Sequence, residues 1–317
     1  MILYTQRACG ALYRYACANR GTYIIPANSC PVVPLTFLKA GCKIEFVDIC
    51  QYDYCIDRQK CLSMVKEQVG IYAGLLFIHT YGLECDISSF GKSLKLIDSG
   101  IKVIDDRCLC LPQLDADIVD GIDFILYSTG YAKSANLGYG GFSVSEEFDY
   151  ELAEELTFVG SDYDGIDYLC KRLLALESFY DGETFNRWLD SSLMDKSFIC
   201  QYREQLSENL EKSERHKKRL NQIYDEYLPN GIKLPPAYQG WRFNVLLDNS
   251  KEVLQSLMDS GLFASKHYQP SGYLFGRERR FTRADKLYAD VINLFNDFYY
   301  TEKQAYETCK VINQNLT

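Results

Sequence analysis

The first half of the chain alternates short apolar runs with amphipathic stretches. The apolar runs occupy residues 23–26, 44–48, 73–80, 101–106 and 122–128. The helix-like segments beside and between them occupy residues 8–18, 31–39, 57–68 and 87–98. Strands that are buried on both faces of a parallel sheet have this continuous apolar character. The alternation therefore predicts an α/β fold with a large, mostly parallel open sheet and helices on both faces.

The second half predicts one long helix and then a smaller α/β unit. An apolar stripe between charged faces favours a helix over residues 198–228, which the segment 229–231, Pro-Asn-Gly, ends. The elements expected after it are a strand near 241–247, a helix opened by Asn249, a strand near 263–268 and a last helix from Thr301, with Gln304 at the capping-box spacing.

Two domains follow from this pattern. We expect a large domain over residues 1–205, and the connecting helix with a small C-terminal α/β domain over residues 206–317. The acidic and aromatic stretch 146–195 is expected to be mostly helical.

Composition excludes several classes of function. Lys and Arg number 34 against 43 Asp and Glu, a formal net charge of -9, which disfavours binding to a nucleic-acid backbone. No apolar run reaches the roughly 18 residues that a membrane span needs. The 13 cysteines are scattered without a CxxC pair or a leader-like segment before them, and the 3 histidines lie far apart. We expect reduced thiols, a cytoplasmic location and no metal site.

Candidate functional residues follow the predicted strands, because ligands of an open parallel sheet bind outside the carboxyl ends of its strands. The segment 127–141, YSTGYAKSANLGYGG, places Lys133 among small residues directly after an apolar run. Most lysines are solvated surface groups, but partial desolvation in this setting would make the amine a Schiff-base nucleophile. Asp105 and Asp106 end another run. An isolated Asp-Asp is usually a cap or a strand end, whereas a buried carboxylate can keep a pyridine nitrogen protonated.

In this order along the chain, the segments resemble the DegT/StrS-type aminotransferases, which are fold-type I pyridoxal-phosphate (PLP) enzymes. The matching blocks span nearly the whole chain: residues 23–49, 75–90, 103–106, 127–133, 138–142 and 292–312. The resemblance implies a PLP-dependent aminotransferase that moves an amino group from an amino-acid donor, such as glutamate, to a keto group of a nucleotide-linked sugar. Surface-polysaccharide or deoxyaminosugar biosynthesis is the implied setting.

The resemblance also implies roles for single residues. Lys133 would form the Schiff base, Asp106 would face the pyridine nitrogen, and Ser128 would contact the cofactor phosphate. The further implied cofactor contacts are the phosphate-binding helix start at Arg7 and Ala8, the stacking position at Cys30, and Asn186, which would be lent to the partner in a homodimer.

The chain departs from the family pattern at some of these positions. Cys30 stands where an aromatic residue often stacks on the cofactor, and Leu109 stands where a glutamine is frequent. The N-terminal arm common in the family is not expected, because Arg7 lies a few residues after Met1. Two alternative functions stay open: a PLP-dependent sugar dehydratase, in which histidine tends to replace the lysine, and a degenerate, non-catalytic partner protein.

Two other polar features favour structural roles. His79 ends an apolar run and is interpreted as a near-core histidine with satisfied hydrogen bonds. The basic cluster Arg277, Arg279 and Arg280 could meet a diphosphate, but a solvated loop is the preferred interpretation.

Overall fold

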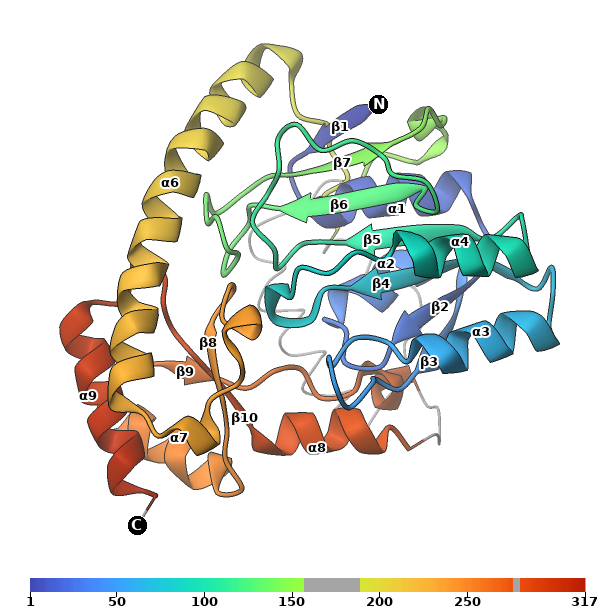
Figure 1. The fold of residues 1–317 in the computed structure, drawn as a ribbon. Coiled ribbons are helices and arrows are strands. Elements are labelled where there is room, and N and C mark those ends of the chain that lie inside the picture. The colour runs from blue at the N-terminus through green and yellow to red at the C-terminus, as the bar shows by residue number, and fades with distance from the viewer. Residues whose placement is uncertain (157–188, 276–279, 317) are drawn as a thin grey trace.

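The computed structural model describes residues 1–156, 189–275 and 280–316, and within these ranges the chain forms one large and one small β-sheet with their helices (Figure 1). The strands are β1 (Ile2–Thr5), β2 (Thr22–Pro26), β3 (Lys43–Val47), β4 (Tyr72–Ile78), β5 (Lys102–Asp106), β6 (Phe124–Ser128), β7 (Gly141–Ser145), β8 (Phe243–Leu246), β9 (Ala264–Ser265) and β10 (Val291–Leu294). The α-helices are α1 (Ala8–Ala18), α2 (Val32–Lys39), α3 (Arg58–Glu67), α4 (Ser88–Ile97), α6 (Lys196–Tyr227), α7 (Ser250–Asp259), α8 (Thr282–Asp290) and α9 (Glu302–Gln314).

The large sheet has the strand order β1-β7-β6-β5-β4-β2-β3 among the described residues. Strands β3, β2, β4, β5 and β6 pair in parallel, and β7 is antiparallel to both of its neighbours, β6 and β1. Each predicted apolar run in the first half lies on one of these parallel strands. The prediction of a mostly parallel α/β sheet is therefore confirmed.

Helices cover both faces of this sheet. Successive side chains of a strand point to opposite faces, so on β2 the side chains of Tyr23 and Ile25 join one apolar cluster and that of Ile24 joins another. The first cluster includes residues of α1 and α2, and the second includes residues of α3 and α4. The continuous apolar strands are thus explained, because burying each large apolar side chain stabilises the fold by about 1.5–3 kcal/mol.

The long helix α6 connects the large sheet to the small one (Figure 1). Its first half packs Tyr202 and Leu206 into a core cluster of the large sheet. Its second half packs Leu220, Ile223 and Tyr224 against the antiparallel sheet β8-β10-β9 and α9. The predicted long helix is confirmed to within two residues at each end. The domain division at residues 205 and 206 stays a prediction.

The structure differs from the sequence-based expectations at two elements. β1 was not predicted, because a four-residue strand has little pattern of its own. The strand expected over 263–268 is reduced to β9, since the chain then leaves the sheet: Nε2 of His267 donates to the Asn28 carbonyl at 3.1 Å and Ser271 N donates to Ala27 O at 2.7 Å.

The stretch 146–195 was expected to be mostly helical, and this expectation stays a prediction. Its residues 157–188 lie outside the described residues. Its described ends contain a 3-10 turn, Tyr150–Leu152, and no α-helix. The guanidinium of Arg14 binds the carbonyls of Tyr150 and Ser191, at 2.8 Å each, and so ties both ends to α1.

No helix in the described part of the chain has the length and apolar character needed to cross a membrane. The described cysteines are free thiols.

Gly141 brings the start of α1 against the end of β6. It lies opposite both Thr5 on β1 and Ser128 on β6. A Cβ at Gly141 would lie 2.6 Å from the Cα of Ala8, closer than van der Waals contact allows. The absence of a side chain therefore lets three chain segments meet at one point of the sheet edge.

We predict that Gly141→Ala lowers the free energy of unfolding by about 1–3 kcal/mol, because the added methyl group must displace the α1 backbone. Chemical denaturation of the variant and the unchanged protein measures this difference. Gly231→Ala is the matched control, since nothing lies within 4 Å of its added Cβ, and its effect should stay within about 1 kcal/mol. Equal effects of the two substitutions would contradict the close approach at Gly141.

Candidate active site

A cavity of about 350 Å³ lies at the carboxyl edge of the large sheet. Six residues singled out in the sequence line it: Arg7, Ala8, Cys30, Asp106, Ser128 and Lys133. They come from the start of α1, the loop after β2, the ends of β5 and β6, and the loop that joins β6 to β7. Asn186, the seventh, lies outside the described residues. Residues far apart in the sequence thus meet at the place where an open parallel sheet binds its ligands.

One end of the cavity is suited to an anion. Helix α1 begins there, and its N-cap residue, Arg7, provides no side-chain cap for the first-turn amides. Free N–H groups and the positive end of the helix dipole attract phosphate groups. The hydroxyl of Ser128 lies on the same cavity and accepts a hydrogen bond from Gly130 N at 3.4 Å. The guanidinium of Arg7 lies 5.9 Å from the centroid of the Tyr131 ring.

Asp106 places a buried carboxylate on the cavity. It is 3% exposed, and its Oδ1 accepts a hydrogen bond from Cys108 N at 2.9 Å. Burial raises its pKa, and the Cys108 contacts and the charge of Lys133 oppose this shift. A carboxylate in such a position is stabilised by a cation brought next to it. Asp106 is therefore suited to bind a cationic group of a ligand.

Lys133 lies on the loop between β6 and β7, which fixed contacts hold in shape. At the base of the loop, Thr129 N donates to Gly140 O at 3.2 Å, and Leu137 N donates to Thr129 O at 2.8 Å. Ala132 has a φ of 58°, in the left-handed region, which costs about 1–2 kcal/mol for a residue with a Cβ. The hydroxyl of Ser134 donates to Leu109 O at 2.6 Å. These contacts constrain the loop, and the lysine that it carries is half-buried.

Asp105, next to Asp106, is bound through both of its carboxylate oxygens. Its Oδ1 lies 2.6 Å from Nε2 of His79, and its Oδ2 accepts from Nε of Arg107 at 2.7 Å. His79 is fully buried, and its Nδ1 lies 2.6 Å from the carbonyl oxygen of Leu83. Because both ring nitrogens face oxygen acceptors, both donate, and the ring is an imidazolium. The prediction of a near-core histidine with satisfied hydrogen bonds is confirmed.

The C-terminal part of the chain closes the cavity on another side. Trp241, His267 and Tyr268 line it. Burial lowers the pKa of His267 to about 4, so the ring is neutral at physiological pH. Because Nε2 donates to the Asn28 carbonyl, Nδ1 of His267 is the unprotonated nitrogen. The sequence did not single out these residues, since no local pattern indicates which cavity a distant segment reaches.

The other residues considered either line the cavity with uncharged side chains or are not among its lining residues. Leu109 lines it, as do the thiols of Cys9 and Cys108. Burial raises the pKa of Cys9 to about 12, and it raises the pKa of Cys108 well above its usual value, so both thiols stay protonated. Of the basic cluster, Arg280 is exposed, and its other two members lie outside the described residues. Nowhere in the described ranges do three or more His, Cys, Asp or Glu side chains form a group that could hold a metal ion.

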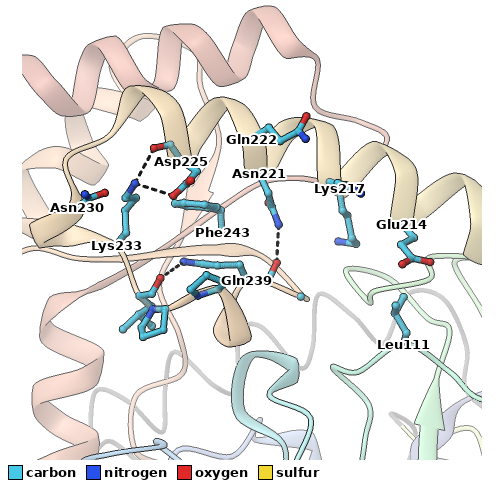
Figure 2. Close-up of a pocket in the computed structure, with 15 residues that line it drawn as sticks. Leu111, Glu214, Lys217, Asn221, Gln222, Asp225, Asn230, Lys233, Gln239 and Phe243 are labelled. Atoms are coloured by element: carbon cyan, nitrogen blue, oxygen red, sulfur yellow. Dashed lines mark hydrogen bonds and ion pairs between the residues drawn. The ribbon is translucent and has the colours of Figure 1, made fainter.

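A second, larger cavity of about 680 Å³ lies between α6 and residues 230–243 (Figure 2). Polar groups on its wall bind one another: Lys233 Nζ donates to Asp225 Oδ1 at 2.8 Å, and Asn221 Nδ2 donates to the main-chain carbonyl of Gln239 at 2.9 Å. Lys217, also on α6, donates to Trp241 O at 2.8 Å and to Asn296 Oδ1 at 2.9 Å. Burial, aided by the charge of Arg242, lowers its pKa to about 7. Lys217 is therefore a second candidate for a reactive amine.

The pairing of His79 with Asp105 predicts a pH dependence of stability. Burial alone would lower the pKa of His79, but the hydrogen bond and charge of Asp105, with those of Cys85, raise it from 6.5 to about 9. The folded state therefore holds the proton more tightly than the unfolded state. The stabilisation is present in full below about pH 6.5 and is lost as the pH rises through about 9.

We expect His79→Gln to reduce the free energy of unfolding more at about pH 6 than at about pH 9.5, measured by denaturation at both values. Each variant value is compared with the unchanged protein at the same pH, which cancels the titration of other groups. A deficit that is the same at both pH values would show that His79 is not an imidazolium in the folded protein.

Comparisons with known proteins agree on the fold. No family model matches the sequence, and no curated protein matches it. Among solved structures, the putative sugar aminotransferase Spr1654 from Streptococcus pneumoniae has a TM-score of 0.72 at 14% identity, covering 100% of this chain and 88% of that one.

Two other solved structures give the same result. DesI, solved in the presence of its TDP-sugar product, has a TM-score of 0.72 at 15% identity and covers 99% of this chain and 80% of its own. A DegT DnrJ EryC1 StrS aminotransferase from Brucella abortus has a TM-score of 0.67 at 14% identity, and the match covers 99% of this chain and 85% of that one. At these identities the likeness concerns architecture, and the chain has the fold of the PLP-dependent sugar aminotransferases.

Proposed function

We propose that this protein is a PLP-dependent aminotransferase that acts on a keto group of a nucleotide-linked sugar. One observation carries the proposal: a lysine, a buried carboxylate, a hydroxyl and an uncapped helix start line a single cavity of about 350 Å³. The cavity lies at the carboxyl edge of a sheet whose fold is shared with solved aminotransferases.

The polar groups that line the cavity match the phosphate, the pyridine nitrogen and the aldehyde of PLP. The phosphate would bind at the first turn of α1 and at the Ser128 hydroxyl, because both present hydrogen-bond donors to an anion. The pyridine nitrogen would face Asp106, whose buried carboxylate favours a cationic partner. Lys133 would supply the amine that holds the cofactor through its aldehyde.

When bound, PLP supplies an electron sink for the carbon that exchanges the amino group. The protein's residues have separate tasks around it. Asp106 would keep the pyridine nitrogen protonated, and Lys133 Nζ would hold and return the proton that moves at the reacting carbon. The neutral thiols of Cys9 and Cys108 would bring no competing charge beside Asp106.

Lys133 is a better candidate than Lys217 for the reactive amine. The low pKa of Lys217 would favour nucleophilic attack, but its Nζ is bound to two carbonyl-type oxygens, Trp241 O and Asn296 Oδ1. Among the described residues, no α-helix begins on the cavity beside it. Lys133 shares its cavity with both the anion site and Asp106.

The finer parts of the proposal rest on the solved structures and on the resemblance in sequence. A nucleotide-linked sugar substrate is supported by DesI, which was solved with a TDP-sugar product. A part in sugar biosynthesis is supported by PseC of Helicobacter pylori, an aminotransferase involved in the biosynthesis of pseudoaminic acid. Glutamate as donor, a homodimer with Asn186 reaching the partner's site, and a cytoplasmic location complete the proposal.

The alternative functions make different demands on the same cavity. A sugar dehydratase of this kind tends to carry histidine where this chain has Lys133, which favours amino transfer. A non-catalytic partner protein is favoured by Cys30 and Leu109 in the cavity wall, where aromatic and amide side chains are frequent in the family.

We predict that borohydride reduction of the protein with PLP attaches the cofactor to Lys133, identified by peptide mapping. Lys133→Ala should remove the label, and Lys217→Met should retain it. Label on Lys217 would contradict the assignment of the amine, and the absence of any label in the unchanged protein would contradict a PLP enzyme altogether. A deoxygenated sugar product without an amino sugar would instead favour the dehydratase.

A further inference from the structure

The two peptide neighbours of Lys133 are both held by residues from distant parts of the chain. The Ala132 carbonyl accepts a hydrogen bond from Nε1 of Trp241 at 2.5 Å. The Ser134 carbonyl accepts one from the hydroxyl of Ser213, on α6, at 2.6 Å. The direction of the lysine between them therefore depends on contacts outside its own loop.

Ala132 needs such a contact more than most residues do. Its φ of 58° lies in the left-handed region, which residues with a Cβ rarely adopt without support. Its side chain is exposed, so packing does not hold it in that conformation. The hydrogen bond from Trp241 to the Ala132 carbonyl is a contact that could hold Ala132 in this conformation.

Trp241 is itself fixed in place from several sides. Its main-chain N donates to Tyr81 O at 3.3 Å, and its carbonyl accepts from Nζ of Lys217 at 2.8 Å. The indole lies parallel to the Tyr81 ring, at a centroid distance of 6.4 Å and an interplanar angle of 3°. Figure 2 shows Lys217 on α6, facing the segment before β8. A side chain anchored in this way can hold a hydrogen bond in one direction.

We propose that Trp241 is a positioning residue for Lys133. By holding the Ala132 carbonyl, it keeps Ala132 in the left-handed conformation and so directs the lysine side chain into the cavity that contains Asp106. The inference rests on the proposed function, since it concerns the amine that would hold PLP. It also ties the lysine to the segment that leads into the small sheet.

Trp241→Phe tests the proposal, because it keeps an aromatic ring and removes the N–H donor. The measurement is the rate at which added PLP forms a borohydride-reducible adduct on Lys133 of the full-length protein, with the dissociation constant of PLP from equilibrium dialysis. We expect the rate to fall, and the dissociation constant to rise, by about five- to tenfold, as for the loss of one partly buried hydrogen bond.

Tyr238→Phe is the matched control. It removes a hydrogen bond of the same kind, from the Tyr238 hydroxyl to the Tyr52 carbonyl at 2.9 Å, in the same segment but away from the lysine loop. It should leave both quantities within about twofold of the unchanged protein. Equal behaviour of the two variants would overturn the proposal.

Substitutions at Ala132 test the same claim without changing Trp241. Ala132→Val should slow adduct formation, because a β-branched residue opposes a positive φ, whereas Ala132→Gly should not. In the Ala132→Gly background, the effect of Trp241→Phe should shrink, because glycine adopts this conformation without a Cβ penalty. An unchanged effect in that background, or normal labelling of Ala132→Val, would show that the conformation of Ala132 does not position the lysine.

The labelling experiment distinguishes an error about Trp241 from an error about the proposed function. If the unchanged protein labels at Lys133 and Trp241→Phe labels equally fast, Trp241 is not a positioning residue and the function stands. If the unchanged protein gives no Lys133 adduct, both are overturned.

Discussion

The close approach of Gly141 to the start of α1 is the contact on which the rest of the candidate site depends. Strand β7 lies antiparallel between β1 and β6, and Gly141 sits opposite a residue of each. Because Gly141 has no side chain, the backbone of Ala8 can lie directly over it. The same hairpin that carries Lys133 therefore also brings Ser128 to the helix start that could bind an anion.

Electrostatics gives the two neighbouring carboxylates different roles. The two carboxylate oxygens of Asp105 bind the positively charged side chains of His79 and Arg107. Asp106 faces the cavity with a main-chain partner at Cys108 and a raised pKa, so its ionised form calls for a cation. A buried carboxylate on the wall of a cavity can hold a cationic group of a ligand. This asymmetry is the physical reason for placing the pyridine nitrogen beside Asp106.

The sequence predicted those parts of the molecule that have a strong local pattern. Continuous apolar runs indicated the parallel strands, and the rule that ligands bind at their carboxyl ends directed attention to Asp106, Ser128 and Lys133. Trp241 and His267 could not be predicted in this way, because they lie just before β8 and just after β9, far along the chain from the other residues of the cavity. The short β9 was overestimated for the same reason, since contacts to the loop after β2 draw the chain out of the sheet.

The central claim is that Lys133 and Asp106 hold the two reactive ends of one PLP molecule. A crystal structure of the 317-residue chain with PLP tests it most directly. We predict electron density that is continuous from Lys133 Nζ to the cofactor, with the ring nitrogen within hydrogen-bond distance of Asp106 and the phosphate at the first turn of α1. PLP bound to Lys217 in the larger cavity, or a ring whose nitrogen faces away from Asp106, would contradict it.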